Sequence, residues 1–304
     1  MKRAAVFLLL LALSGFVLAQ QPQQTPNQQK QPSEAGSSAG AAPQANAPAA
    51  KRPPQAKTQP EFDAYQAAIK NANDPAAMEK SADDFAAKFP DSELRVLLYR
   101  TAMHDYQSAN SAEKMSEMAQ KVLQIDPDDP EALIGAAEVI AERTRDTDLD
   151  KDQRFAEAQK DAQRALQTAD TDVAIPAGTP QEKIDMYKGF LRSSAYSILG
   201  TIAFNEKNYV EAESQFRKSI DALPSQPDPV VVLRLAIALD NQGKYAEALK
   251  EANRAVDLTQ ENTSAGTLAR RERDRLVQLT GGSPAAPPSK PPAGAAQNSS
   301  PPSP

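Results

Sequence analysis

The side chains that could carry out chemistry are few, and the chain has a single histidine, His104. A metal site or an acid–base centre needs several such groups converging in one pocket, so one imidazole does not make a site by itself. Cysteine is absent, which excludes disulfides, thiolate nucleophiles and cysteine-ligated metals. We therefore expect His104 to be a surface or groove residue without a catalytic role.

A second candidate is an acidic run whose spacing is similar to that of a calcium-binding loop. Its carboxylates occupy the first, third, fifth and twelfth places of the run, at Asp146, Asp148, Asp150 and Glu157. Such a loop turns sharply on a glycine in the sixth place, where this chain has Lys151. We therefore favour the alternative that these acids solvate an extended turn and that Asp152 or a neighbour caps the helix after it.

The usual signatures of other enzymes are also missing from the sequence. Its 12 glycines form neither GxGxxG nor GxxxxGK[ST], the patterns that cradle phosphates. No serine lies in a nucleophile elbow. We therefore expect no enzymatic activity and no cofactor, and look for a binding function instead.

The charge balance limits the class of partner. The chain has 34 Lys and Arg against 40 Asp and Glu, a formal net charge of −6 and a pI near 5.1. An acidic protein is poorly suited to contact a phosphate backbone. The sequence therefore predicts protein partners and no nucleic acid.

The N-terminal residues are typical of a secretory signal. Lys2 and Arg3 precede an apolar run over residues 4–17, and a small residue, Ala19, stands where a signal peptidase would cut. At 14 residues, the run is shorter than the roughly 20 needed to cross a bilayer. We predict a signal peptide over 1–19, an exported (periplasmic or secreted) product and no stable membrane span after cleavage. An uncleaved anchor is the alternative.

Two further segments lack the residues that a hydrophobic core would bury. Residues 20–59 are rich in Gln, Pro and Ala, and residues 281–304 are rich in Pro. Such compositions cannot bury enough apolar surface to offset the entropy of ordering the chain. The sequence predicts a disordered linker and a disordered tail, which leave residues 60–280 as the folded domain.

The folded domain carries a helical pattern that repeats. Apolar residues recur at spacings of three and four, and no alternating strand pattern of any length is present. Tyr209 and Tyr245 are separated by 36 residues, as are Ala212 and Ala248. A repeat of this period is the signature of a stacked array of helix pairs.

The repeat is similar to that of a known family. Gly200 in a first helix, Tyr209 at the turn, Ala212 and Phe216 in a second helix and then Pro224 form a pattern that resembles the tetratricopeptide repeat. The resemblance implies an all-α, right-handed α-solenoid of helix pairs with about five repeats, two of them divergent. It also implies a C-terminal capping helix, for which the charged stretch before residue 280 is suited.

An insertion near residues 168–192 interrupts the pattern. Its first half has the composition of a loop, and its second half is helical in spacing. Thr179 as N-cap, Pro180 in the first turn and Glu182 three residues after the cap form a capping box. We predict one long helix from Pro180 to about Asn205.

The function implied by the resemblance is protein binding. In tetratricopeptide proteins the first helix of each pair lines a concave groove that holds a segment of another protein. The family's carboxylate clamp is not supported, because Val230 and Ile237 stand where charged or amide groups are wanted. The candidates for the groove are Arg100, His104, Glu138, Thr201, Phe204, Asn205, Arg234 and Asn241.

We therefore predict an exported, non-enzymatic interaction scaffold. One alternative is a component of an envelope assembly or secretion machine. A less favoured alternative is an enzyme-accessory or calcium-binding domain that uses the acidic turn at residues 146–157.

Overall fold

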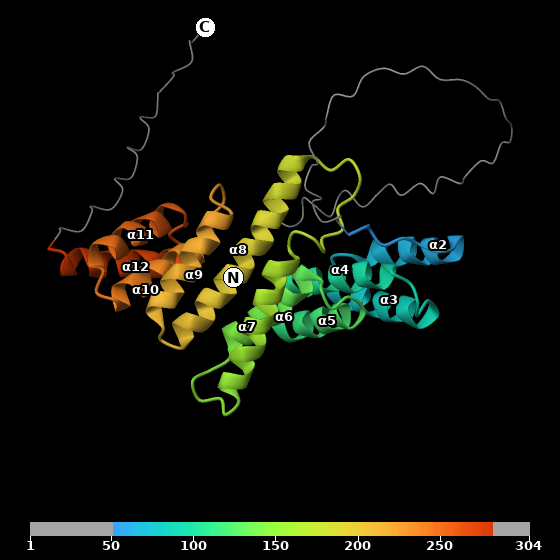
Figure 1. Ribbon diagram of the computed structural model, residues 1–304, viewed down its shortest axis with the longest axis horizontal. Helices are drawn as coiled ribbons and strands as arrows, with labels where there is room; N and C mark the ends of the chain where they lie inside the picture. Colours follow the sequence, from blue (N-terminus) through green and yellow to red (C-terminus); the bar gives the residue numbers. More distant parts are fainter. Residues whose placement is uncertain (1–50, 282–304) are drawn as a thin grey trace, which may run out of the picture.

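The computed structural model describes residues 51–281, and this part of the chain is helical, without a strand (Figure 1). The predicted signal peptide, most of the predicted linker and nearly all of the predicted tail lie outside the described residues. The helices are α2 (Gln59–Ala68), the short η1 (Ile69–Asn71), α3 (Pro75–Lys88), α4 (Leu94–Ser108), α5 (Ala112–Ile125), α6 (Pro130–Arg143), α7 (Lys151–Thr168), α8 (Gln181–Asn205), α9 (Tyr209–Ala222), α10 (Pro229–Asn241), α11 (Tyr245–Asp257) and α12 (Ser264–Leu279).

These helices pack in consecutive pairs, and the pairs stack side by side into an array (Figure 1). The pairs are α2 with α3, α4 with α5, α6 with α7, α8 with α9, and α10 with α11, while α12 packs on α11 and α10. The prediction of an all-α array of helix pairs with a further helix at its C-terminal end is therefore confirmed.

Three helices begin at the same local signal, an aspartate followed by a proline. The side chains of Asp74, Asp129 and Asp228 accept hydrogen bonds from backbone N–H groups in the first turns of α3, α6 and α10, at 3.1, 2.9 and 2.8 Å. The proline fixes a helical φ at a position that needs no N–H donor. Each such cap stabilises its helix by about 0.5–2 kcal/mol.

Close packing within the pairs depends on small residues. A Cβ atom at Gly200 would lie 2.5 Å from the ring of Phe216, which is fully buried. A Cβ atom at Gly189 would lie 2.7 Å from the carbonyl oxygen of Ala222. The glycines of α8 therefore allow α9 to approach closely along its length.

The inserted segment confirms one prediction and corrects another. A single long helix, α8, does run to Asn205, but the predicted capping box does not form. Thr179 instead donates its hydroxyl hydrogen bond to the carbonyl oxygen of Pro176 at 2.8 Å, and Pro180 occupies the cap position without a side-chain bond. The predicted cap of α7 by Asp152 or a neighbour falls at the neighbour Asp150, which occupies the N-cap position but makes no side-chain capping bond, while Asp152 lies in the first turn.

Residues 51–58 form an extended strap along the array, which corrects the predicted linker boundary at residue 59. At one end Lys51 pairs with Asp126 after α5 at 2.5 Å, and its backbone N–H bonds the carbonyl of Thr171 after α7 at 3.1 Å. Further along, Arg52 makes two hydrogen bonds to Glu93 before α4, at 2.8 and 2.5 Å. The strap thus crosses the connections that follow α3, α5 and α7.

Candidate functional site

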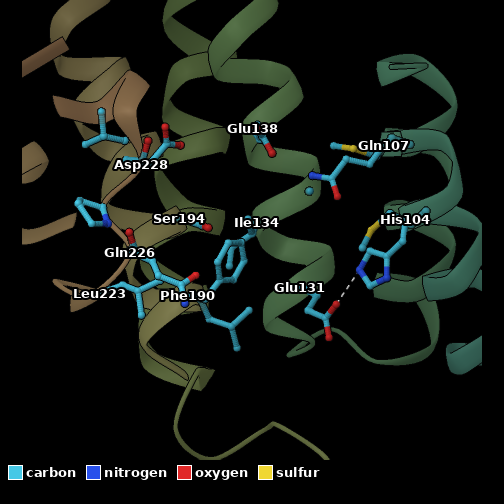
Figure 2. A pocket seen from close by; sticks show the side chains of 18 of the residues that line it. His104, Gln107, Glu131, Ile134, Glu138, Phe190, Ser194, Leu223, Gln226 and Asp228 are labelled. Carbon is cyan, nitrogen blue, oxygen red and sulfur yellow. Dashed lines mark ion pairs between the residues drawn. The ribbon is translucent and has the colours of Figure 1, made fainter. Parts of the chain in front are cut away.

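One hollow of the array is a groove with a cavity volume of about 300 Å³, bounded by α4, α6, α8 and the turn before α10 (Figure 2). Its apolar lining comes from separate elements, at Met103, Met115, Ile134, Phe190, Leu191, Leu223 and Val231. Its polar lining includes His104, Gln107, Glu131, Glu138, Ser193, Ser194, Ser197, Gln226 and Asp228. We call this hollow the groove.

A buried network of charges closes one end of the groove. The carboxylate of Glu131, at the start of α6, lies 2.7 Å from Nε2 of His104 (dashed in Figure 2). It also accepts a hydrogen bond from the hydroxyl of Tyr187. Arg100 lies 3.5 Å from Glu131 and pairs more closely with Asp129, the N-cap of α6. The network therefore joins the first helices of three consecutive pairs, α4, α6 and α8.

The network brings buried charges of opposite sign together, while Nε of Arg100 has no hydrogen-bond partner within the described part of the chain and burial raises the pKa of Asp129. Burial acts to raise the pKa of Glu131, but the Arg100 guanidinium and the hydrogen bonds from His104 and Tyr187 outweigh it and lower that pKa to about 2. Burial likewise acts to lower the pKa of Arg100, and the carboxylates of Asp129 and Glu131 raise it above its usual value. The guanidinium of Arg100 therefore binds the carboxylates at the start of α6.

A second polar contact set joins α6, α8 and α10 beyond the groove. Arg234 on α10 donates to the hydroxyl of Thr201 on α8 at 2.8 Å and pairs with Glu142 on α6 at 2.8 Å. Asn205 on α8 donates to the carbonyl oxygen of Ala141 at 3.1 Å. These side chains hold neighbouring pairs in register.

The two other candidates make local contacts. Phe204 packs edge-on against Tyr209, with ring centroids 5.5 Å apart, and lies against the core of the C-terminal pairs. Asn241 bonds the carbonyl oxygen of Ile237 in its own helix at 2.8 Å. Of the eight residues proposed for the groove, the structure places two, His104 and Glu138, in its lining.

The acidic turn does not gather its carboxylates. Lys151 lies 3.5 Å from Asp146, and Asp148 accepts the backbone N–H of Arg145 at 2.9 Å. Within residues 51–281, no group of three or more His, Cys, Asp or Glu side chains is arranged to hold a metal ion. The spacing of the acids along the sequence is therefore not matched by a cluster in space.

Sequence reasoning missed the residues that α8 contributes to the groove and its network. Tyr187, Phe190, Ser194 and Ser197 follow one another at spacings of three and four along the predicted helix, so they share one face. Phe190, Ser194 and Ser197 line the groove, and Tyr187 belongs to the network at its end. The predicted long helix from Pro180 to about Asn205 contains this face, so its spacing could have indicated these residues.

No helix within the described range is long and apolar enough to cross a bilayer.

The helices of the described residues pack in consecutive pairs, and α4, α6 and α8, the first helices of three pairs, line the groove. This arrangement is that of a tetratricopeptide-like array. The sequence matches no protein-family model and no curated protein.

Solved structures of similar architecture exist. MamA (MSR-1, C2) is 17% identical with a TM-score of 0.40, covering 62% of this chain and 88% of its own. A tetratricopeptide repeat protein from Parabacteroides merdae is 13% identical with a TM-score of 0.37, and the match covers 72% of this chain and 87% of the other. Acl4, an assembly chaperone of RpL4, is 12% identical with a TM-score of 0.35, and the match covers 73% of this chain and 98% of the other. These values are too low to carry an inference about function, so the fold assignment rests on the helix pairs themselves.

Proposed function

We propose that this protein is a non-enzymatic interaction scaffold that binds a segment of a partner protein in the groove. One observation carries the proposal: side chains from the first helices of three consecutive pairs surround an open hollow with an apolar floor and a polar rim. Such hollows are the surfaces that stacked helical repeats offer to partners. Buried apolar contacts supply affinity, and the polar rim orients the bound segment.

Site-specific crosslinking tests this proposal. A photo-crosslinking residue placed at Ser194, in the groove wall, should capture a defined partner band when the protein is expressed in its own cells. The matched control is the same residue at Gln153, which is exposed on α7 and lines neither the groove nor the hollow at the α6–α7 surface. Equal capture from both positions, or capture from Gln153 alone, would show that the groove is not the binding surface.

The proposal includes export to the cell envelope, as a periplasmic or secreted protein. It is supported by the sequence of the N-terminus, where Lys2 and Arg3 precede the apolar run and Ala19. N-terminal sequencing of the protein isolated from its own cells should begin at Gln20. A mature protein that begins at Met1 in the cytoplasm would reject this part of the proposal without affecting the binding function.

A further inference from the structure

We infer that two copies of this chain associate through the outer faces of their α12 helices, which pack against each other in antiparallel orientation. This self-association goes beyond the proposed function, because no residue of α11 or α12 lines the groove. It follows from two properties of α12: the exposure of its outer face, and the order of apolar and charged side chains along that face.

The outer face of α12 carries apolar side chains that the array does not bury. The helix lies at the end of the array opposite α2 and packs on α11 and α10 (Figure 1). Its inward side is buried at Gly266, Ala269, Leu276 and Val277. On the other side, Leu268 and Leu279 are 51% and 52% exposed. Burial of these two leucines against another surface would therefore be favourable.

The exposed leucines belong to a narrow stripe with a regular spacing. Leu268, Glu272, Arg275 and Leu279 follow one another at intervals of four, three and four residues. Because successive helical residues are rotated by about 100°, these four lie within an arc of about 60°. Alternation of four and three is the spacing of the seam of a two-helix coiled coil. We call these four residues the outer stripe.

The order of residues in the outer stripe makes it complementary to itself in one orientation. In an antiparallel pair, Leu268 lies opposite Leu279 of the second copy, and Glu272 lies opposite Arg275 of the second copy. The same contacts recur in the other direction about a twofold axis, as an isologous interface requires. In a parallel pair, each charged residue would meet its own like charge. The charges therefore select the antiparallel dimer.

The guanidinium of Arg275 can bind an additional carboxylate. Within its own chain, its Nη2 lies 3.1 Å from Glu272 and also pairs with Asp240 on α10. Its side chain is still 46% exposed, and within residues 51–281 its Nη1 makes no hydrogen bond. Five N–H donors allow one guanidinium to bind several acceptors. In the dimer, acids and bases would alternate across the axis.

The predicted dimer is weak, and it leaves the groove of each copy uncovered. A single helix pair buries less than the roughly 1,200–2,000 Å² of a standard stable interface, so association should depend on protein concentration. The dimer would carry two grooves. A partner that presents two copies of its segment would then bind more tightly than one that presents a single copy.

Sedimentation velocity on the full chain, at increasing protein concentration, tests the association. The unmodified chain should show a monomer–dimer equilibrium, and Leu268→Asp should weaken it at least about tenfold. The matched control is Val210→Asp on α9, where the valine is 68% exposed, and it should leave the equilibrium unchanged. Circular dichroism checks that each variant keeps its helices. A chain that remains monomeric, or a dimer that both substitutions weaken equally, would overturn the inference.

A charge exchange tests the pairing of Glu272 with Arg275. Arg275→Glu alone and Glu272→Arg alone each place like charges across the axis, so each variant should be mainly monomeric. An equimolar mixture of the two restores opposite charges and should form heterodimers. Mixing cannot repair damage within a single chain. If the unmodified chain dimerises and the mixture stays monomeric, the inferred pairing is wrong.

Introduced thiols test the orientation, because the chain has no cysteine of its own. Under mild oxidation, a mixture of Leu268→Cys and Leu279→Cys should give a disulfide-linked heterodimer. Either variant alone should link poorly, since equivalent positions in the antiparallel dimer lie about 16 Å apart, beyond the reach of a disulfide. Efficient self-linking of one variant would overturn the antiparallel arrangement. Crosslinking at Ser194 decides the proposed function independently of all these results.

Discussion

The two halves of the array hold their neighbouring pairs together by different means. Between α4, α6 and α8, the contacts include buried charges, with Asp129 and Glu131 shielded from solvent and held by Arg100 and His104. Between α8 and α12, the core consists mainly of alanine, valine and leucine, and ion pairs such as those of Arg217 with Glu247 and of Arg234 with Glu142 are partly exposed. Both halves have apolar cores, and the first half adds to its cores a buried cluster of charges that joins neighbouring pairs.

This difference has a consequence for function. The half with the ionic cluster (α4, α6 and α8) supplies most of the groove lining. The half with the more apolar contacts (α8 to α12) forms a tightly packed end that α12 covers. Buried ion pairs are demanding in geometry and are costly when broken. The groove is therefore framed by contacts that fix the positions of α4, α6 and α8, and substitutions can test how far the two halves differ.

The largest expected effect comes from Arg100→Met. Removal of the guanidinium leaves the buried carboxylates of Asp129 and Glu131 without their main counter-charge, so the free energy of unfolding should fall by about 3–5 kcal/mol. Urea denaturation measures this loss. The control is Arg275→Met on α12, whose more exposed guanidinium pairs with Glu272 and with Asp240 on α10 and should contribute about 0–1 kcal/mol. Equal losses would erase the distinction between the halves.

The next effect is a pH dependence specific to the ionic half. The pKa of Glu131 is lowered from 4.5 to about 2 on folding, so its carboxylate stabilises the fold above pH 4.5 and loses this contribution as the pH falls toward 2. The difference in unfolding free energy between the unmodified protein and Glu131→Gln should therefore shrink by about 3 kcal/mol between pH 6 and pH 2. Denaturation at several pH values measures it. A difference that stays constant, as expected for the exposed Glu157→Gln, would contradict the assignment.

The apolar half is tested by Gly200→Ala. The added Cβ would lie 2.5 Å from the buried ring of Phe216, so α8 and α9 must separate or the ring must move. Overpacking of this kind should cost about 1–3 kcal/mol, visible as a lower melting temperature. The smaller side chain in Gly200→Ala/Phe216→Leu should recover part of the loss relative to Phe216→Leu alone. A melting temperature unchanged by Gly200→Ala would show that this contact is not tight.

The smallest expected effect is that of Arg234→Gln. Its contacts with Thr201 and Glu142 are partly exposed, so the unfolding free energy should change by only about 0–1 kcal/mol. Urea denaturation of Arg234→Gln and Arg100→Met under the same conditions compares the two losses of unfolding free energy directly. A loss as large as that of Arg100→Met would show that both halves depend on charge.

Much of the fold could be predicted because its signals are local. The spacing of apolar residues predicts the helices, the Asp–Pro pairs mark the starts of α3, α6 and α10, and the period of 36 residues relates Tyr209 to Tyr245. The groove was predicted less well. A helix projection shows which way Arg100 and Arg234 point, but not that an acid on a neighbouring pair takes up each of them.

The sequence by itself therefore determined the helices and the length of α8, because each depends on residues within a turn or two of one another, and its repeat of 36 residues indicated how the helices pair. Tertiary structure alone decided that Arg100 on α4 meets Asp129 and Glu131 on α6 and that Tyr187 on α8 closes the same cluster. It also decided that residues 51–58 lie along the array, in a stretch whose composition predicts disorder. The physical reason is that ion pairs and buried hydrogen bonds depend on which side chains packing brings together, and these partners stand one or more helices apart.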